Sequence, residues 1–215
     1  MTKILVTGDR SWDGSVLPEN VTLPQLLEVI QQIWFPGDET QPPTLIHGAA
    51  KGLDQAAEVA AQQLNWGTNP YPADWVTHGK RAGHIRNHEM IATNPNLVIA
   101  FPLESLNPNQ KEQKHSRGTW NAVKQATKHQ PDLDILIIWG NRIYPYTQHT
   151  LETTVSKLEQ LKINPTLLLN NLTLDLTGEP NLTQKPYLNI QQVTTFLQST
   201  IKPDILMNNR KNGVR

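Results

Sequence analysis

Three polar turns that contain glycine carry most of the residues suited to binding an anion. The first is Gly8-Asp9-Arg10-Ser11, the second runs from His47 to Gly52, and the third is Ser116-Arg117-Gly118-Thr119. The second and third turns open helical patterns, and a helix N-terminus offers unpaired backbone N–H groups that suit a phosphate. Glycine lets a ligand approach the backbone closely. The turns therefore predict a phosphate site, although glycine after a strand also serves simply to turn the chain.

A second group of polar residues lies between the second and third turns, from Pro72 to Met90. Arg86 and Met90 are one helical turn apart and share a face. An arginine near the start of a helix can clamp a phosphate through two hydrogen bonds. The alternative interpretation is structural: Asp74 forms an ion pair with Arg86, and Trp75 belongs to the core.

Several other side chains near the turns allow two interpretations. His47 could donate to a phosphate, act as a base, or cap the following turn. Asp54 lies in a first helical turn, where a carboxylate is favourable, but it could instead hold a ribose hydroxyl. Asp9 allows the same kind of ambiguity between a structural and a ligand-binding role. Trp12 could stack on a base or pack in the core.

A metal site is the remaining chemistry to consider. His84 and His88 are four residues apart on a predicted helix, with His78 or Asp74 as a third ligand, and this spacing can hold a metal. No complete metal-binding signature is present, so we expect neither a metal nor a cofactor.

Short apolar runs alternate with amphipathic segments and would position these residues. The predicted strands are 3–7, 44–47, 97–101, 133–139 and 166–176, and the predicted helices are 24–35, 53–64, 83–93, 119–129, 150–162 and 189–200. Residues 70–79 are expected to be irregular. Apolar strands alternating with helices predict an α/β fold, a Rossmann-like open and mostly parallel sheet with helices on both faces. In such sheets ligands bind at the carboxyl ends of the strands.

Composition narrows the classes of function. The 215 residues contain 19 Lys and Arg and 19 Asp and Glu, so the formal net charge is zero. Proteins that bind long nucleic acids through their phosphates usually carry a basic excess, so the composition disfavours that class of function. The absence of cysteine excludes disulfides, thiolate zinc sites and cysteine nucleophiles. The sequence shows no signal peptide and no apolar run long enough to span a membrane. We therefore expect a cytoplasmic protein with no membrane partner.

Four blocks occur in an order that resembles a known family. They are Gly8-x-Arg10-x-Trp12, His47-Gly48-x-Ala50-x-Gly52-x-Asp54, Pro72-Ala73-Asp74-Trp75 and Arg86-Asn87-x-x-Met90, followed by Phe101-Pro102 and Gly118-Thr119. Together they resemble the YspA-like group of the SLOG superfamily, named for the DprA and LOG proteins, over about residues 1–139. The resemblance implies a Rossmann-like fold that binds nucleotides or their derivatives. Relatives in the superfamily include phosphoribohydrolases, sensors of signalling nucleotides and one branch that binds single-stranded DNA.

The chain departs from the family pattern at several positions. Ala49 stands where the family usually has glycine. A polar insertion within residues 103–116 divides the glycine-rich run of the family, and it could be a lid over the site or a segment with no role in binding. The hydrolase relatives carry a glutamate three residues after the threonine that matches Thr119, and this chain has Ala122 there. Because cleavage of an N-glycosidic bond needs acid–base help, this difference favours binding over catalysis.

We therefore expect a non-enzymatic protein that senses or sequesters a nucleotide-derived, possibly cyclic, signalling ligand. The alternatives are a phosphoribohydrolase or other nucleotide hydrolase using Asp9, His47, Asp54 or Asp74 and, more weakly, a single-stranded DNA binder. Residues 1–140 are expected to form the nucleotide-binding domain, residues 141–215 a C-terminal α+β extension, and the protein a homo-oligomer. No catalytic residue is assigned. The expected ligand-binding residues are Gly8, Asp9, Arg10, Trp12, His47, Gly48, Lys51, Gly52, Asp54, Asp74, Arg86, Asn87, Ser116, Arg117, Gly118 and Thr119.

Overall fold

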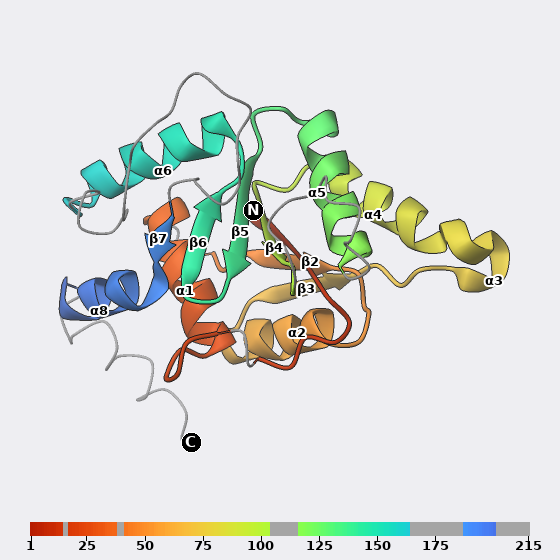
Figure 1. Ribbon diagram of the computed structural model, residues 1–215, viewed down its shortest axis with the longest axis horizontal. Coiled ribbons are helices and arrows are strands. Elements are labelled where there is room, and N and C mark those ends of the chain that lie inside the picture. Colours follow the sequence, from red (N-terminus) through yellow and green to blue (C-terminus); the bar gives the residue numbers. More distant parts are fainter. Residues whose placement is uncertain (15–16, 38–40, 104–115, 164–186, 201–215) are drawn as a thin grey trace.

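A single seven-stranded sheet runs through the centre of the molecule (Figure 1). The computed structural model describes residues 1–14, 17–37, 41–103, 116–163 and 187–200. The strand order is β3-β2-β1-β4-β5-β6-β7. The strands are β1 (Lys3–Gly8), β2 (Thr44–His47), β3 (Gly67–Pro70), β4 (Leu97–Phe101), β5 (Asp134–Trp139), β6 (Arg142–Pro145) and β7 (Leu188–Asn189).

The sheet is mixed, with five parallel strands and an antiparallel edge. Strands β3, β2, β1, β4 and β5 pair in parallel, whereas β6 and β7 pair antiparallel. The central strands are almost wholly apolar because both of their faces are covered; all five residues of β4, for example, are buried. The expected fold class, an open and mostly parallel α/β sheet, is confirmed.

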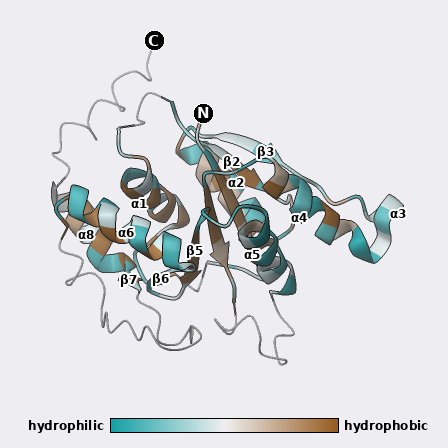
Figure 2. Ribbon diagram, turned by 90° about the horizontal axis from the view of Figure 1, so that it is seen from above, coloured by the Kyte–Doolittle hydropathy of each residue, from teal (hydrophilic) through white to brown (hydrophobic). Residues whose placement is uncertain are grey.

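Helices cover the two faces of the sheet in separate layers (Figure 2). On one face lie α1 (Leu23–Trp34), α2 (Leu53–Gln63), α6 (Gln148–Gln160) and α8 (Ile190–Thr200), and on the other α4 (Ala82–Ala92) and α5 (Arg117–His129). Side chains alternate between the layers: Ile4 and Val6 pack with the first group, and Leu5 packs with the second. The short helix α3 (Trp75–His78) projects away from the body (Figure 1).

Local sequence explains how the helices begin and pack. The side chain of Thr22 accepts from the Gln25 backbone N–H and the side chain of Gln25 accepts from the Thr22 backbone N–H, which forms a capping box at the start of α1. The buried Ala57, Ala60 and Ala61 allow α2 to lie close to the sheet.

The strand order reverses between β1 and β4. The chain passes from β1 to β2 and β3 on one side, then crosses to β4 and β5 on the other. Because Gly8 of β1 is level with Phe101 of β4, the turns that follow these two strands open side by side. This reversal point is where open α/β sheets bind ligands.

Some elements differ from the sequence-based predictions. The stretch expected to be irregular contains α3, and β3 and β6 were not predicted. Beyond residue 140 the chain continues the same sheet through β6 and β7, and the helix predicted at 189–200 is α8. The strand predicted at 166–176 and most of the 103–116 insertion lie outside the described residues. Among the described residues, no helix is both long and apolar enough to cross a membrane.

Candidate ligand-binding site

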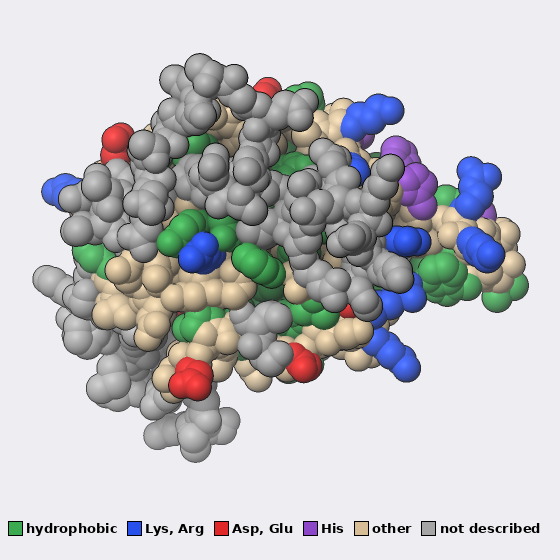
Figure 3. Space-filling view, in the orientation of Figure 1, with side chains coloured by type: hydrophobic (Ala, Val, Ile, Leu, Met, Phe, Trp, Pro, Cys, Tyr) green, Lys and Arg blue, Asp and Glu red, His purple; other side chains and the backbone are tan. Residues whose placement is uncertain are grey.

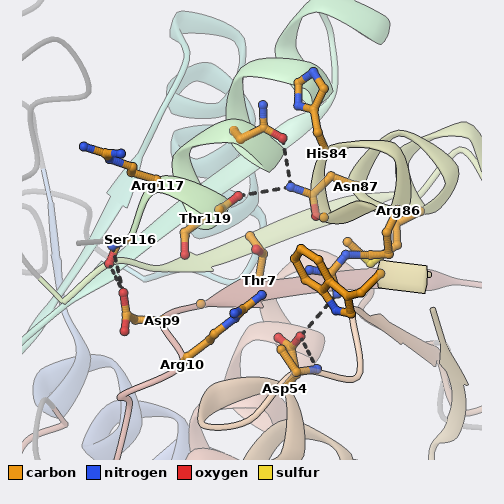
Figure 4. Close-up of a pocket in the computed structure, with 17 residues that line it drawn as sticks. Thr7, Asp9, Arg10, Asp54, His84, Arg86, Asn87, Ser116, Arg117 and Thr119 are labelled. Atoms are coloured by element: carbon orange, nitrogen blue, oxygen red, sulfur yellow. Dashed lines mark hydrogen bonds and ion pairs between the residues drawn. The ribbon is translucent and has the colours of Figure 1, made fainter. Parts of the chain in front are cut away.

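A cavity of about 470 Å³ opens at the reversal point, between the ends of β1 and β4 (Figure 4). Its volume falls within the range of ligand pockets, roughly 300–1,000 Å³. Its wall mixes polar, charged and aromatic side chains. The lining residues are Thr7, Gly8, Asp9, Arg10, Ala50, Asp54, Trp75, Gly83, His84, Arg86, Asn87, Met90, Ser116, Arg117, Gly118, Thr119 and Asn121.

Most of the expected ligand-binding residues line this cavity. The first and third turns, Arg86 and Asn87 meet there although they are far apart in sequence (Figure 4). The expected residues that do not line it are Trp12, His47, Gly48, Lys51, Gly52 and Asp74.

The N-terminus of α5 forms one wall of the cavity. The first intrahelical bond runs from the Trp120 N–H to the carbonyl of Ser116 at 3.0 Å, and the Ser116 side chain does not cap the helix. Gly118 has open space where a side chain would stand. The Thr119 side chain is buried, and its Oγ1 has no hydrogen-bond partner among the described residues. This wall therefore combines helix N–H groups with a hydroxyl that lacks a partner.

Asp9 joins the first turn to the third. Its carboxylate accepts hydrogen bonds from the Ser116 backbone N–H and from Ser116 Oγ, both at 2.8 Å, and from the Ser11 N–H at 2.9 Å. Burial by itself would raise the pKa of Asp9, but these hydrogen bonds outweigh it and hold the pKa below its usual value. Asp9 is therefore an ionised group that holds Ser116 in its left-handed conformation, φ 55°.

Arg86 is bound on the protein side of the cavity. Its Nη1 donates to the Gly48 carbonyl and lies 3.8 Å from Asp54 Oδ2. Asp54 also accepts from the Ala50 N–H at 3.1 Å. Burial raises the pKa of Asp54, and the Ala50 hydrogen bond and the Arg86 charge offset only part of that effect. The partner of Arg86 is thus Asp54, and the Asp74–Arg86 pair considered from the sequence does not form.

Glycines in the first two turns make room for the protein itself. A Cβ on Gly8 would collide with Leu53, one on Gly48 would collide with the Arg86 guanidinium, and one on Gly52 would lie 2.5 Å from the Arg10 carbonyl oxygen. At Gly8, Gly48 and Gly52 the absence of a side chain is therefore required by contacts within the protein. Of the glycines in the three turns, Gly118 is the one with open space beside it.

The second turn reaches the cavity only through Ala50, and its C-terminal end packs against the first turn. The Leu53 N–H, at the start of α2, donates to the Asp9 carbonyl at 3.3 Å. His47 is fully buried, and its Nδ1 accepts from the Ala49 N–H at 3.3 Å, so it stabilises its own turn. Lys51 is exposed in this turn.

Two other expected residues have structural partners outside the cavity. Trp12 is buried and packs edge to face on Phe101, with ring centroids 6.1 Å apart. Asp74 caps α3 by accepting from the Thr77 N–H at 2.9 Å. These contacts support packing for Trp12 and capping for Asp74.

Sequence reasoning missed several lining residues. Trp75 was expected in the core if it was structural, but it is 50% exposed and lines the cavity. Asn121 also lines the cavity, and its Oδ1 accepts from Asn87 Nδ2 at 2.9 Å and Gln125 Nε2 at 2.7 Å. The helical spacing from Arg117 to Asn121, one turn apart, is the signal that could have found Asn121. The remaining missed residues are Thr7, Ala50, Gly83, His84 and Met90.

The histidines of α4 do not converge with other metal ligands. His84 contacts Gln125, and the His88 ring meets the His129 ring edge to face at 6.4 Å. Across the described ranges, no three His, Cys, Asp or Glu side chains gather as a metal site. Ala122 is fully buried in α5.

Comparison with known proteins identifies a phage relative. The chain is 30% identical over 133 residues to the Gene 61 protein of Mycobacterium phage D29, an alignment that covers 60% of this chain and 90% of the phage protein. No model of a protein family matches the chain, and no solved structure matches it.

Proposed function

The chain belongs to the family of the Gene 61 protein of Mycobacterium phage D29, and we propose that it binds a nucleotide or a nucleotide-derived signalling ligand, as a sensor or sequestering protein. The proposal draws on the geometry of the cavity. The resemblance to YspA-like SLOG proteins points to the same class of ligand.

The observation that carries the proposal is the open N-terminus of α5 at the strand reversal. Helix N–H groups and the partial positive charge of the helix favour an anion there. Thr119 Oγ1 is a buried hydroxyl without a partner, and such a group costs free energy until something binds it. A phosphate oxygen at this wall would accept from the hydroxyl and the N–H groups together.

Charge around the cavity favours an anionic ligand. Arg10 and Arg117 are exposed and line the cavity. Arg86 also lines it, beside Asp54. Figure 3 shows Lys, Arg and His side chains gathered at the end of the molecule that carries α3 and α4. A protein with zero formal net charge therefore presents a locally basic entrance.

Binding without cleavage fits the carboxylates better than catalysis does. The acidic side chains in the cavity wall are Asp9 and Asp54. Asp9 is bound to Ser116, and Asp54 is bound to Ala50 and Arg86. A hydrolase remains the second candidate because Asp54 lines the cavity with a raised pKa, which is a property of general acids.

Ligand-induced stabilisation tests the proposal. The full-length protein is heated with mononucleotides, NAD, ADP-ribose, cyclic ADP-ribose and cyclic dinucleotides, and each mixture is then analysed by chromatography. A true ligand at a hundredfold excess over its Kd raises the free energy of unfolding by about 2.7 kcal/mol. Intact ligand supports the binding protein, cleaved ligand supports the hydrolase, and no shift with any compound contradicts both.

A matched pair of threonine variants locates the anion. Thr119→Val should weaken binding about 10- to 100-fold because it removes a hydrogen bond to a charged group. It should not destabilise the unliganded protein, since the lost hydroxyl has no partner there. The control is Thr127→Val on the same helix. Thr127 Oγ1 donates to the Val123 carbonyl at 3.0 Å, and Thr127 does not line the cavity. Equal affinities of the two variants would exclude the α5 wall as the phosphate site.

A further inference from the structure

We infer that Trp75 is the stacking platform for a planar ring of the ligand, and that the Arg10 guanidinium occupies this platform until the ligand arrives. The inference rests on the proposed nucleotide function and assigns the part of the cavity that recognises the base.

Trp75 is the most exposed of the six tryptophans. It is 50% exposed and Trp139 is 38% exposed, whereas Trp12, Trp34, Trp66 and Trp120 are each at most 8% exposed. An exposed indole offers a flat apolar face on which another planar ring can pack. Trp75 also lines the same cavity as the α5 wall, so one ligand can contact both.

The position of the Trp75 ring is defined from two sides. A Cβ built on Gly83 would lie 3.4 Å from the ring atom Cη2, so the six-membered ring lies beside the backbone of α4. The Arg10 guanidinium carbon lies 5.3 Å from the ring centroid. No residue of α3 is buried. The ring is therefore positioned by its contacts with the α4 backbone and with Arg10 of the first turn.

Arg10 is a suitable placeholder for a base. A guanidinium is flat and delocalised, and it stacks on aromatic faces as a heterocycle does. Its attraction to an exposed ring is weak compared with the stacking of a whole base, which covers more of the ring. Figure 4 shows Arg10 reaching between the Asp9–Ser116 pair and Asp54. When a base takes the ring, Arg10 is therefore positioned to turn toward the phosphate.

The experiment compares probes with and without a base. Binding of adenosine 5′-monophosphate and of ribose 5-phosphate is measured by calorimetry on full-length wild type, Trp75→Phe, Trp75→Leu and Val76→Ala. Val76 is the matched control because it is 99% exposed and does not line the cavity. Tryptophan fluorescence provides a second readout, since stacking on Trp75 quenches its emission.

We expect Trp75→Leu to weaken binding of the mononucleotide roughly five-fold to a hundred-fold, with a smaller loss for Trp75→Phe and none for Val76→Ala. Ribose 5-phosphate should bind all four proteins alike and should not quench. Equal mononucleotide affinity of Trp75→Leu and wild type would overturn the platform while leaving the proposed function intact. If neither probe nor any compound of the nucleotide panel binds the wild type, the proposed function fails and the inference fails with it.

Discussion

At the scale of the residue, Arg86 shows that a cavity-lining cation can belong mainly to the fold. Its side chain is 11% exposed and that of Asp54 is 7% exposed. Its guanidinium donates to the Gly48 carbonyl and pairs with Asp54. Arg86 is therefore less available to a ligand than the sequence predicts. Arg10, which is exposed and contacts Trp75, is the more accessible cation.

Arg86→Ala is therefore expected to destabilise the protein by about 3–5 kcal/mol, because it leaves the buried Asp54 without its charge partner. Denaturant unfolding would measure this loss. Arg10→Ala is the control: its stability should change by no more than about 0.5 kcal/mol, while its affinity for an anionic ligand falls. An Arg86→Ala protein as stable as the wild type would show that the pair contributes little to the fold.

At the scale of the element, the three turns have the same kind of sequence and different roles. The Asp9 carbonyl of the first turn accepts from the first N–H of α2, and the Gly48 carbonyl of the second turn accepts from Arg86. The third turn leaves open space at the start of α5. A glycine in each turn therefore responds differently to the same substitution.

Gly52→Ala and Gly118→Ala should separate folding from binding. Gly52 has φ +75° and backbone atoms within 2.6 Å of a new Cβ, so alanine there should cost about 2–4 kcal/mol. Gly118 has open space, so alanine should leave the free energy of unfolding unchanged or raise it by up to about 1 kcal/mol. Its methyl group should weaken ligand binding about tenfold by blocking the approach. Thermal melts and calorimetry on both variants measure these effects; a destabilised Gly118→Ala would contradict the open wall.

The sequence predicts the elements whose pattern is local. Apolar runs such as Leu97–Phe101 identify the buried strands, and helical spacing identifies α1, α2 and α8. Strand β3 has the sequence Gly-Thr-Asn-Pro, which carries no strand signal and becomes a strand only by pairing with β2. Its formation depends on tertiary contacts that no short window contains.

The same distinction applies to the site. Turns at strand ends are visible in the sequence, so the first and third turns were expected at the cavity, where they lie. Which glycine faces open space depends on packing between distant elements, as with Gly48 and Arg86. Trp75 could not be placed because its exposure follows from the projecting α3, not from its neighbours in sequence.

At the scale of the whole molecule, stability should depend on pH through His47. This side chain is fully buried, and its Nε2 has no partner among the described residues. Burial lowers the pKa of His47 despite the nearby Asp54 and Glu58. The unfolded chain therefore takes up a proton more readily than the folded protein, and the stability present above about pH 6.5 is lost as the pH falls toward the folded pKa.

The free energy of unfolding, measured at about pH 7.5 and about pH 5.5, should thus fall on acidification. His47→Asn should reduce this dependence because asparagine can still accept from the Ala49 N–H but does not titrate. His88→Asn, an exposed histidine on α4, should retain the wild-type dependence. A His47→Asn protein with an unchanged pH slope would assign the acid sensitivity to other groups. The lowered pKa of Asp9 also makes the free energy of unfolding fall on acidification, at lower pH. The raised pKa of Asp54 has the opposite effect on the free energy of unfolding.

The outer strand β3 also determines how copies of the chain can associate. Among the described residues it is the free edge of the parallel sheet, it has four residues, and Pro70 at its end has no N–H to donate. The opposite edge, β7, is two residues long. Short edges and a proline discourage the recruitment of foreign strands and the aggregation that follows from it. A homo-oligomer of this protein would therefore assemble through helix surfaces and loops, and not by continuing one sheet into the next.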